Sequence, residues 1–181
     1  MSRHLRFVPD GGALVEVTCR TIQGRLLLRP SPQLNDIILG VLGRAQERYP
    51  VDIVCFSFLS SHYHVLLWVR DARQLALFMG YFNGNLARKV GRLTGWTDRI
   101  WSRRYQAILV SDEEAAQVDR MTYILANGVK ENLVARVEEW PGAHSAHALL
   151  TGEPVEGIWH DRTLTRTLRL QRKPLEPAQI E

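Results

Sequence analysis

The order in which strand-like and helix-like hydrophobic patterns follow one another restricts the fold of this chain more than any other feature. Four segments alternate apolar and polar residues, or are rich in β-branched and aromatic residues, and are predicted to be strands: residues 13–21, 51–59, 64–69 and 105–110. Apolar residues recur at helical spacing between the first and second strands, over 34–45, and between the third and fourth, over 75–90. The resulting order β-α-β-β-α-β predicts a ferredoxin-like, or RRM-like, four-stranded antiparallel sheet of the α+β class.

The two helices would cover one face of the sheet and leave the other face for a functional site or for a third helix. A third helix is predicted after the fourth strand, where Ser111 and Glu114 have the S-x-x-E spacing of a capping box. It is expected to run to about Asn127 and to stop at Gly128. Its predicted buried face is an apolar stripe formed by Ala115, Val118, Met121, Thr122 and Leu125. Tyr123 and Asn127 lie roughly opposite this stripe and four residues apart, so they share one face.

Size and composition exclude several classes of protein. A chain of 181 residues that is 45% hydrophobic and 23% charged is typical of a globular domain, and not of collagen, a coiled-coil rod or a disordered tail. We expect residues 1–150 to form this domain and residues 151–181 to form a basic, partly irregular extension. Cys19 and Cys55 lie far apart and in no CxxC spacing, which argues against a disulfide scaffold or a Cys-rich zinc site and favours a reducing compartment. Because the chain has neither a long apolar run nor the start of a signal peptide, we expect it in the cytoplasm and without a membrane partner.

Basic side chains are concentrated in two stretches of the sequence. Residues 88–104 hold six Lys and Arg against the single acid Asp98, and residues 162–173 hold five against none. Such stretches suit a phosphate backbone, although a solvated surface is the simpler alternative. Residues 91–104 are predicted to be a loop, and its Arg and Trp residues have the composition of a groove for single-stranded nucleic acid: Trp96, Arg99, Trp101, Arg103 and Arg104. The alternative is a surface loop anchored by its two tryptophans.

His62 and His64 form the candidate metal site. They are separated by one residue at the start of a predicted strand, so both imidazoles point to the same face and can reach one metal ion. Imidazoles combined with oxygen ligands could hold Mn²⁺ or, less readily, Mg²⁺. The alternative is that one ring is packed and the other is hydrogen-bonded. His144 and His147 are spaced three apart and are interpreted as structural, because no Cys or acid completes a metal-binding pattern around them.

Four sequence blocks between about Gly12 and Leu150 resemble one known family. They are RTIQGRLLLR, SSHYHVLLWV, RYQAILVSDEE and TYILANGVKENLV, and they occur in this order. The last block is similar to the pattern Tyr-Ile-x-x-Asn-Pro-Val-[Arg/Lys]-x-x-Leu-Val. In these blocks the chain resembles the REP-associated tyrosine transposases, a branch of the single-tyrosine HUH transposases and nucleases. It differs from the usual pattern at Ser61, where the family has Asn, and at Gly128, where the family has Pro and where glycine would loosen the connection.

The resemblance implies a specific enzyme and a specific set of site residues. His62, His64 and Asn127 would bind a divalent metal ion, Mg²⁺ or Mn²⁺, and Tyr123 would be the nucleophile. The implied substrate is single-stranded DNA, as hairpins near repeated extragenic elements, which is cut and rejoined through a covalent 5′-phosphotyrosine by a monomer or homodimer. Two alternatives stay open: a domesticated, non-cleaving protein that binds single-stranded DNA or RNA hairpins, and a metal-dependent hydrolase that uses water and forms no covalent intermediate.

Overall fold

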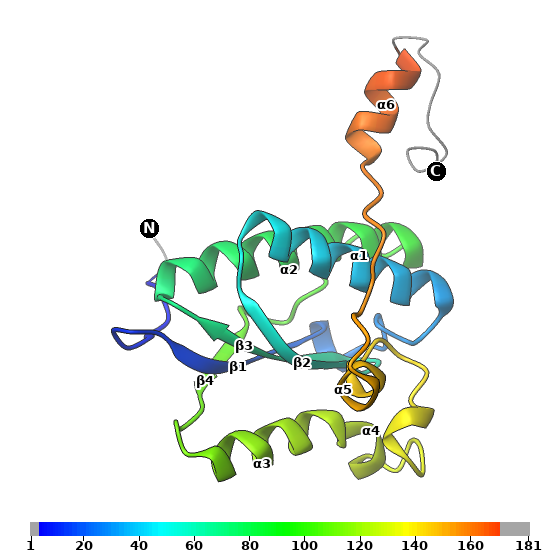
Figure 1. Ribbon diagram of the computed structural model, residues 1–181. Coiled ribbons are helices and arrows are strands. Elements are labelled where there is room, and N and C mark those ends of the chain that lie inside the picture. The colour runs from blue at the N-terminus through cyan, green and yellow to red at the C-terminus, as the bar shows by residue number, and fades with distance from the viewer. Residues whose placement is uncertain (1–3, 171–181) are drawn as a thin grey trace.

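The computed structural model describes residues 4–170 and consists of a four-stranded antiparallel sheet between two layers of helices (Figure 1). The strands are β1 (Ala13–Arg20), β2 (Asp52–Phe58), β3 (His62–Val69) and β4 (Gln106–Leu109). They are arranged in the order β2-β3-β1-β4, with β1 pairing antiparallel to both β3 and β4. This is the predicted ferredoxin-like α+β fold. β3 begins at His62, two residues earlier than expected.

Two long helices cover one face of the sheet and enclose the main core with it (Figure 1). Helix α1 (Pro32–Arg48) begins at Ser31, whose hydroxyl accepts a hydrogen bond from the backbone N–H of Leu34 at 3.2 Å. Helix α2 (Ala72–Thr94) begins at Asp71, whose carboxylate accepts one from the N–H of Gln74 at 2.7 Å. The largest fully buried core side chains come from both helices and from the strands: Leu34, Ile38, Phe58, Tyr63, Leu67, Phe78 and Phe82.

Helix α2 extends further than its apolar pattern predicts. Residues 91–94 were expected to be loop, but they complete the last turn of α2, which ends at Gly95 in a left-handed conformation with φ 68°. Because glycine adopts this conformation without a steric penalty, it terminates the helix cleanly. The short helix η1 (Ile22–Gly24), which follows β1, has no signal in the hydrophobic pattern and was not predicted.

The opposite face of the sheet is covered by helix α3 (Glu114–Leu125) and the short helix α4 (Asn127–Lys130) (Figure 1). The predicted capping box is wrong: the N-cap is Glu113, and the Ser111 hydroxyl accepts from the N–H of Glu113 at 3.3 Å instead. The helix ends at Leu125 and the chain turns directly into α4. Gly128 is therefore a helical residue and not a C-cap, and it packs so closely that an added Cβ would lie 3.3 Å from the Val134 side chain.

The chain after α4 attaches to the free edge of the sheet at β2. Following η2 (Val137–Glu139), the Trp140 indole N–H donates to the backbone oxygen of Phe58 at 2.9 Å, and the N–H of Phe58 donates to the oxygen of Ala143 at 2.9 Å. After α5 (Ala146–Thr151), an irregular segment passes α1 and leads to α6 (Arg162–Leu170), which projects from the body (Figure 1). Residues 171–181, the end of the extension expected to be basic and partly irregular, lie outside the described residues.

Both cysteines are buried free thiols within the described chain. Burial raises the pKa of Cys19 to about 11 and that of Cys55 to about 12, so both thiols stay protonated at neutral pH. The two cysteines are therefore not joined in a disulfide.

Over residues 4–170, no helix is long and apolar enough to cross a membrane.

Candidate active site

The sheet face that α3 covers is polar at its centre. Because side chains alternate along a strand, Glu16, Thr18 and Arg20 of β1 project to the face opposite the main core. The register of β1 with β3 places Thr18 opposite His64 and Arg20 opposite His62. A patch of charged and polar side chains therefore lies beneath α3, on the face predicted to be free for a functional site.

A cavity of about 360 Å³ lies over this patch, between the sheet and α3. Its lining contains two histidines, a tyrosine and four arginines, namely His62, His64, Tyr123, Arg20, Arg103, Arg104 and Arg120. The fold thus brings together three of the four residues predicted for catalysis and metal binding, although they are up to 61 positions apart in the sequence. The arginines give the cavity a positive lining, which suits a phosphate group.

The two histidines are held in a defined orientation. Their ring centroids are 5.3 Å apart. Nδ1 of His62 lies 3.2 Å from the Ser61 hydroxyl, and Nδ1 of His64 lies 2.6 Å from a carboxylate oxygen of Glu16. Among the described residues, both rings make their hydrogen bonds through Nδ1, so Nε2 is the atom that each can offer to a metal ion. Burial, together with the charges of His64 and Arg20, lowers the pKa of His62 to about 4, which keeps its ring neutral at physiological pH.

Glu16 connects the sheet to α3, and it was not predicted from the sequence to have a role in the site. Only 2% of its surface is exposed, and one carboxylate oxygen contacts His64 while the other accepts from Nη1 of Arg120 at 2.9 Å. A buried carboxylate needs such partners, because an unpaired charge away from water is costly. Carboxylates that hold the second nitrogen of a metal-binding histidine fix its tautomer and orientation.

Tyr123 lies on α3 one turn after Arg120 and next to the histidine pair. Its ring centroid is 5.9 Å from that of His64, and 39% of its surface is exposed. Two cations hold the ring: Nζ of Lys130 is 4.0 Å from its centroid, and the Arg120 guanidinium carbon is 5.6 Å away. The Tyr123 side chain is therefore oriented by contacts and still accessible to a substrate in the cavity.

The predicted buried stripe of α3 is partly right. Met121 and Leu125 are half-buried beside the buried Ile124, whereas Ala115, Val118 and Thr122 are exposed, Val118 at 52%. Ile124 packs into a small second core with Leu14, Cys55, Leu66 and Val110. The side of α3 that faces the sheet therefore carries Ile124, with Arg120 and Tyr123 on it or beside it. This mixture is possible because the sheet face beneath α3 has both apolar and charged side chains.

Truncation of Ile124 is expected to loosen the attachment of α3. Replacing this fully buried residue by alanine should lower the free energy of unfolding by about 2–5 kcal/mol, because it leaves a cavity in a small cluster. Urea denaturation measures the loss. The matched control is Val118→Ala on the same helix, which we expect to change stability by less than about 0.5 kcal/mol. Equal losses for the two variants would contradict the orientation of α3 described here.

Asn127 is the predicted metal ligand that does not line the cavity. It lies at the start of α4, only 4% of its surface is exposed, and within the described residues its amide nitrogen has no hydrogen-bond partner. A flip of the amide exchanges its nitrogen and oxygen, so this unpaired position can equally present a carbonyl oxygen.

The side chains around the cavity fit a divalent cation as an open site. Two imidazoles, combined with oxygen ligands, suit Mn²⁺ and, less readily, Mg²⁺, whereas the buried Asn127 amide does not line this cavity. Over the described chain, no group of three or more His, Cys, Asp or Glu side chains is placed to hold a metal ion. His62 and His64 would therefore hold the cation, Asn127 is the further candidate, and substrate or water oxygens would fill the remaining positions.

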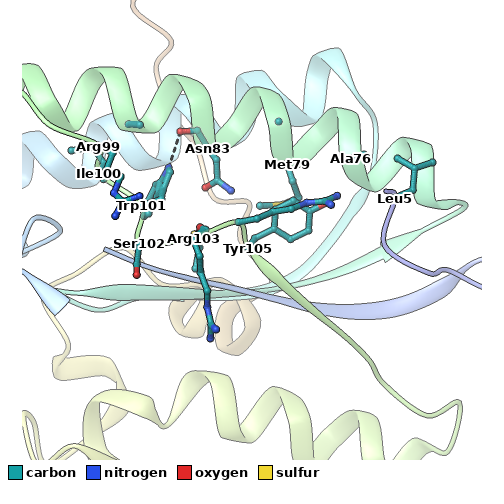
Figure 2. Close-up of a pocket in the computed structure, with 14 residues that line it drawn as sticks. Leu5, Ala76, Met79, Asn83, Arg99, Ile100, Trp101, Ser102, Arg103 and Tyr105 are labelled. Atoms are coloured by element: carbon teal, nitrogen blue, oxygen red, sulfur yellow. Dashed lines mark hydrogen bonds between the residues drawn. The ribbon is translucent and has the colours of Figure 1, made fainter. Parts of the chain in front are cut away.

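The aromatic and basic residues predicted to bind nucleic acid divide between neighbouring cavities. Arg103 and Arg104 line the cavity beneath α3, whereas Arg99 and Trp101 line a second cavity against α2. Trp96 follows the end of α2 and lines a third hollow. The Arg25 guanidinium there is 4.6 Å from the centroid of the Trp96 ring. Both tryptophans also anchor the loop: the Trp101 indole N–H donates to the backbone oxygen of Asn83 at 3.0 Å (Figure 2), and that of Trp96 donates to the oxygen of Arg99 at 3.2 Å.

His144 and His147 lie outside the cavity beneath α3. His144 forms an isolated bridge with Ser57 of β2, and its Nδ1 accepts from the N–H of Ala146 at 3.2 Å. Burial lowers its pKa. His147 is exposed, 3.6 Å from a carboxylate oxygen of Glu153. These contacts agree with the structural interpretation of the pair.

Solved structures, and not sequence matches, show which known proteins have a similar fold. No protein-family model matches the chain, and no curated protein matches its sequence. Among solved structures, it is similar to a REP-associated tyrosine transposase that was solved bound to a REP hairpin, with a TM-score of 0.61 and 18% identity over 85% of this chain and 89% of that one. A second, a candidate transposase from Deinococcus radiodurans, gives a TM-score of 0.46 and 16% identity over 74% and 98% of the two chains. The chain therefore has the fold of the REP-associated tyrosine transposases, the family that its motifs resemble.

Proposed function

We propose that the protein is a metal-dependent transposase or endonuclease that cleaves and rejoins single-stranded DNA hairpins through a covalent bond to Tyr123. The observation that carries this proposal is the cavity that Tyr123 shares with the two histidines. The ring centroids of Tyr123 and His64 are 5.9 Å apart, and arginines line the cavity around them. A partly exposed tyrosine next to paired histidines supplies the nucleophile and the candidate metal ligands that a covalent attack on a phosphodiester needs. The proposed location is the cytoplasm, and the proposed partner is a hairpin with single-stranded flanks.

The reaction needs neither water nor a nucleotide cofactor. The Tyr123 oxygen attacks the scissile phosphorus, a bond from that oxygen to phosphorus forms, and the bond from phosphorus to the 3′ oxygen breaks. The products are a 5′-phosphotyrosine and a strand with a free 3′-OH, and the proton lost by the phenol balances the proton gained by the leaving oxygen. Because the phosphotyrosine conserves the energy of the phosphodiester, a 3′-OH can attack it in reverse and rejoin the strands.

Each part of the cavity has a role in this scheme. His62 and His64 would hold a divalent cation, which when bound polarises a non-bridging phosphate oxygen. Glu16 accepts a hydrogen bond from Nδ1 of His64 and so fixes the tautomer that would leave Nε2 available to a cation. Arg120 and Lys130 hold the Tyr123 ring in place for an in-line attack. Arg103 and Arg104 bind and orient the phosphates of the strand.

A second function, binding of a hairpin without cleavage, is favoured by one observation. Asn127 does not line the catalytic cavity, so the third candidate ligand from the chain is not in position beside the histidines. A protein that only binds DNA would use the arginines and would not need Tyr123.

A trapping experiment distinguishes the two functions. Labelled hairpins with single-stranded flanks, taken from both sides of the protein's own gene, are incubated with Mn²⁺ or Mg²⁺ and separated on a denaturing gel. The expected result is a slow, protease-sensitive band and a released strand whose 3′-OH can be extended by a polymerase. Retardation on a native gel without any covalent band would favour the binding protein. Cleavage without an adduct would indicate hydrolysis by water.

A further inference from the structure

The segment between α5 and α6, residues 153–161, is held tightly against α1, and we call it the strap. An added Cβ on Gly157 of the strap would overlap the backbone of Leu39. An added Cβ on Gly40 of α1 would overlap the backbone of Ile158. Two backbones approach this closely only where neither position has a side chain. The strap therefore has a fixed path across the helices.

The end of the strap is anchored on α2 and leads into α6. The Trp159 ring packs against Tyr81, with ring centroids 6.4 Å apart, and Nζ of Lys89 lies 4.6 Å from the Trp159 ring centroid. The same Nζ donates to the backbone oxygen of His160 at 3.1 Å. Asp161 then caps α6, because its carboxylate accepts from a backbone N–H of the first turn at 2.9 Å. α6 therefore starts from a defined point beside the C-terminal half of α2.

Two basic stretches that are separate in the sequence meet at this point. Residues 88–92 of α2 hold three Lys and Arg and no acid, and residues 162–173 hold five and no acid. Lys89 contacts the strap two residues before α6 begins, so the end of one stretch lies beside the start of the other. The Arg92 and Arg166 side chains are exposed. We call α6 and residues 88–92 together the α2–α6 basic surface.

This basic surface and the cavity beneath α3 lie on different sides of the sheet. In Figure 1, α6 extends beyond the layer of α1 and α2, whereas α3 covers the opposite face of the sheet. A phosphate bound next to Tyr123 is therefore separated from α6 by the sheet and by the helical layer. The cations of the α2–α6 basic surface are placed for a different phosphate group.

We propose that the α2–α6 basic surface binds duplex DNA at a second site, separate from the cavity beneath α3. Closely spaced cations suit the regular phosphates of a duplex. An α-helix is about 10–12 Å across, and α6, with nine residues, is about 14 Å long, which suits a major groove about 12 Å wide. α6 contains no aromatic residue, so it lacks the stacking surface of a single-strand site and the Trp or Phe of a membrane-surface helix.

A duplex at this surface keeps the protein on chromosomal DNA while the cavity on the other side of the sheet stays open to a hairpin. The strap supports this role, because it fixes where α6 leaves the helical layer. The inference goes beyond the proposed function and does not depend on cleavage at Tyr123.

Three single substitutions form a matched set. Arg166→Gln and Arg92→Gln each remove one exposed cation, from α6 and from the end of α2. Arg73→Gln removes an exposed cation from the opposite end of α2 and is the control. Glutamine is a good helix former and all three positions are exposed, so we expect the three variants to fold.

The test measures binding of a fluorescent blunt duplex that has neither a hairpin nor a single-stranded flank. Its affinity is measured by anisotropy in EDTA over a range of salt concentrations. We expect Arg166→Gln and Arg92→Gln each to weaken binding by about threefold or more and to reduce the slope of log affinity against log salt by about 0.9, the value for one lost phosphate contact. The variant that combines them should lose about twice as much slope, whereas Arg73→Gln should keep the affinity and slope of the wild type.

Several results would overturn the proposal. Equal losses for Arg73→Gln and the other two single variants would show a response to total charge alone. Absence of duplex binding by the wild type, or wild-type affinity in the combined variant, would remove the site. Binding to vesicles with anionic lipids that is lost in the combined variant, while duplex binding is kept, would assign the surface to a membrane instead.

The hairpin trapping experiment in Mn²⁺ separates this proposal from the proposed function. Duplex affinity that depends on Arg92 and Arg166, in a protein that forms no covalent adduct, supports the second site and contradicts the nuclease. A covalent adduct in the wild type, together with unchanged duplex affinity in the combined variant, supports the nuclease and contradicts the second site.

Discussion

Replacing Tyr123 with phenylalanine is expected to abolish covalent attachment and cleavage while DNA binding is retained. The substitution removes the single oxygen that the proposed mechanism uses as nucleophile. We expect the cleavage rate to fall by at least about 10³-fold, since the loss of a catalytic nucleophile in other enzymes costs as much or more. Single-turnover cleavage of a labelled hairpin in Mn²⁺ measures this loss.

Binding should survive, because the phenylalanine ring keeps the contacts that orient residue 123. The Lys130 ammonium and the Arg120 guanidinium contact the face of the ring, not the hydroxyl group. Affinity measured in EDTA is therefore expected to stay within about threefold of wild type, a change of less than 1 kcal/mol. Tyr49→Phe, at the end of α1, is the matched control and should cleave normally. Undiminished cleavage by Tyr123→Phe would show that Tyr123 is not the nucleophile.

Replacing His64 with alanine is expected to remove metal-dependent cleavage and most of the affinity for Mn²⁺. His64 supplies one of two imidazoles in the cavity, and its loss also leaves the buried Glu16 carboxylate with Arg120 alone. We expect cleavage to fall by at least about 10²-fold, the scale of damage to a metal site, and Mn²⁺ binding measured by calorimetry to weaken in parallel. His147→Ala removes an exposed histidine outside the cavity and should change neither quantity. Full Mn²⁺ affinity in His64→Ala would contradict the metal assignment.

Glu16→Gln is a smaller change at the same site. Glutamine is close in shape and can still accept from Arg120, but it cannot hold the imidazole with a negative charge. Substitution of such a carboxylate lowers metal affinity by about 10–100-fold in other proteins. We expect a smaller loss of Mn²⁺ affinity than in His64→Ala, measured directly by calorimetry so that the result does not depend on cleavage. An unchanged affinity would show that Glu16 has only a structural role.

The orientation of α3 illustrates what the sequence could not determine. A prediction from periodicity assumes that the buried face of a helix is its apolar face. Here the sheet beneath α3 carries Glu16 and His64, so the helix docks through the Arg120 ion pair and through Ile124. The apolar residue Val118 is left exposed. The rule holds for α1 and α2, because the face that they cover is entirely apolar.

The histidine pair and Tyr123 could be chosen as candidate site residues from the sequence because their signals are local. Residues two apart on a strand point to the same face of the sheet, and the family resemblance implies that Tyr123 is the nucleophile. Glu16 had no such signal, because an acid on the polar side of an alternating strand is usually solvated. Its burial depends on a helix about a hundred residues later, through a contact with Arg120 that spans 104 positions.

The most direct test of the account is to locate the covalent bond. DNA–protein adducts formed by the wild-type protein with a gene-flanking hairpin and Mn²⁺ are digested with trypsin and nuclease and sequenced by mass spectrometry. The account predicts a nucleotide attached through its 5′ phosphate to Tyr123, in the peptide that begins at Met121. A nucleotide on another residue, or cleavage of the hairpin with no modified peptide, would contradict it.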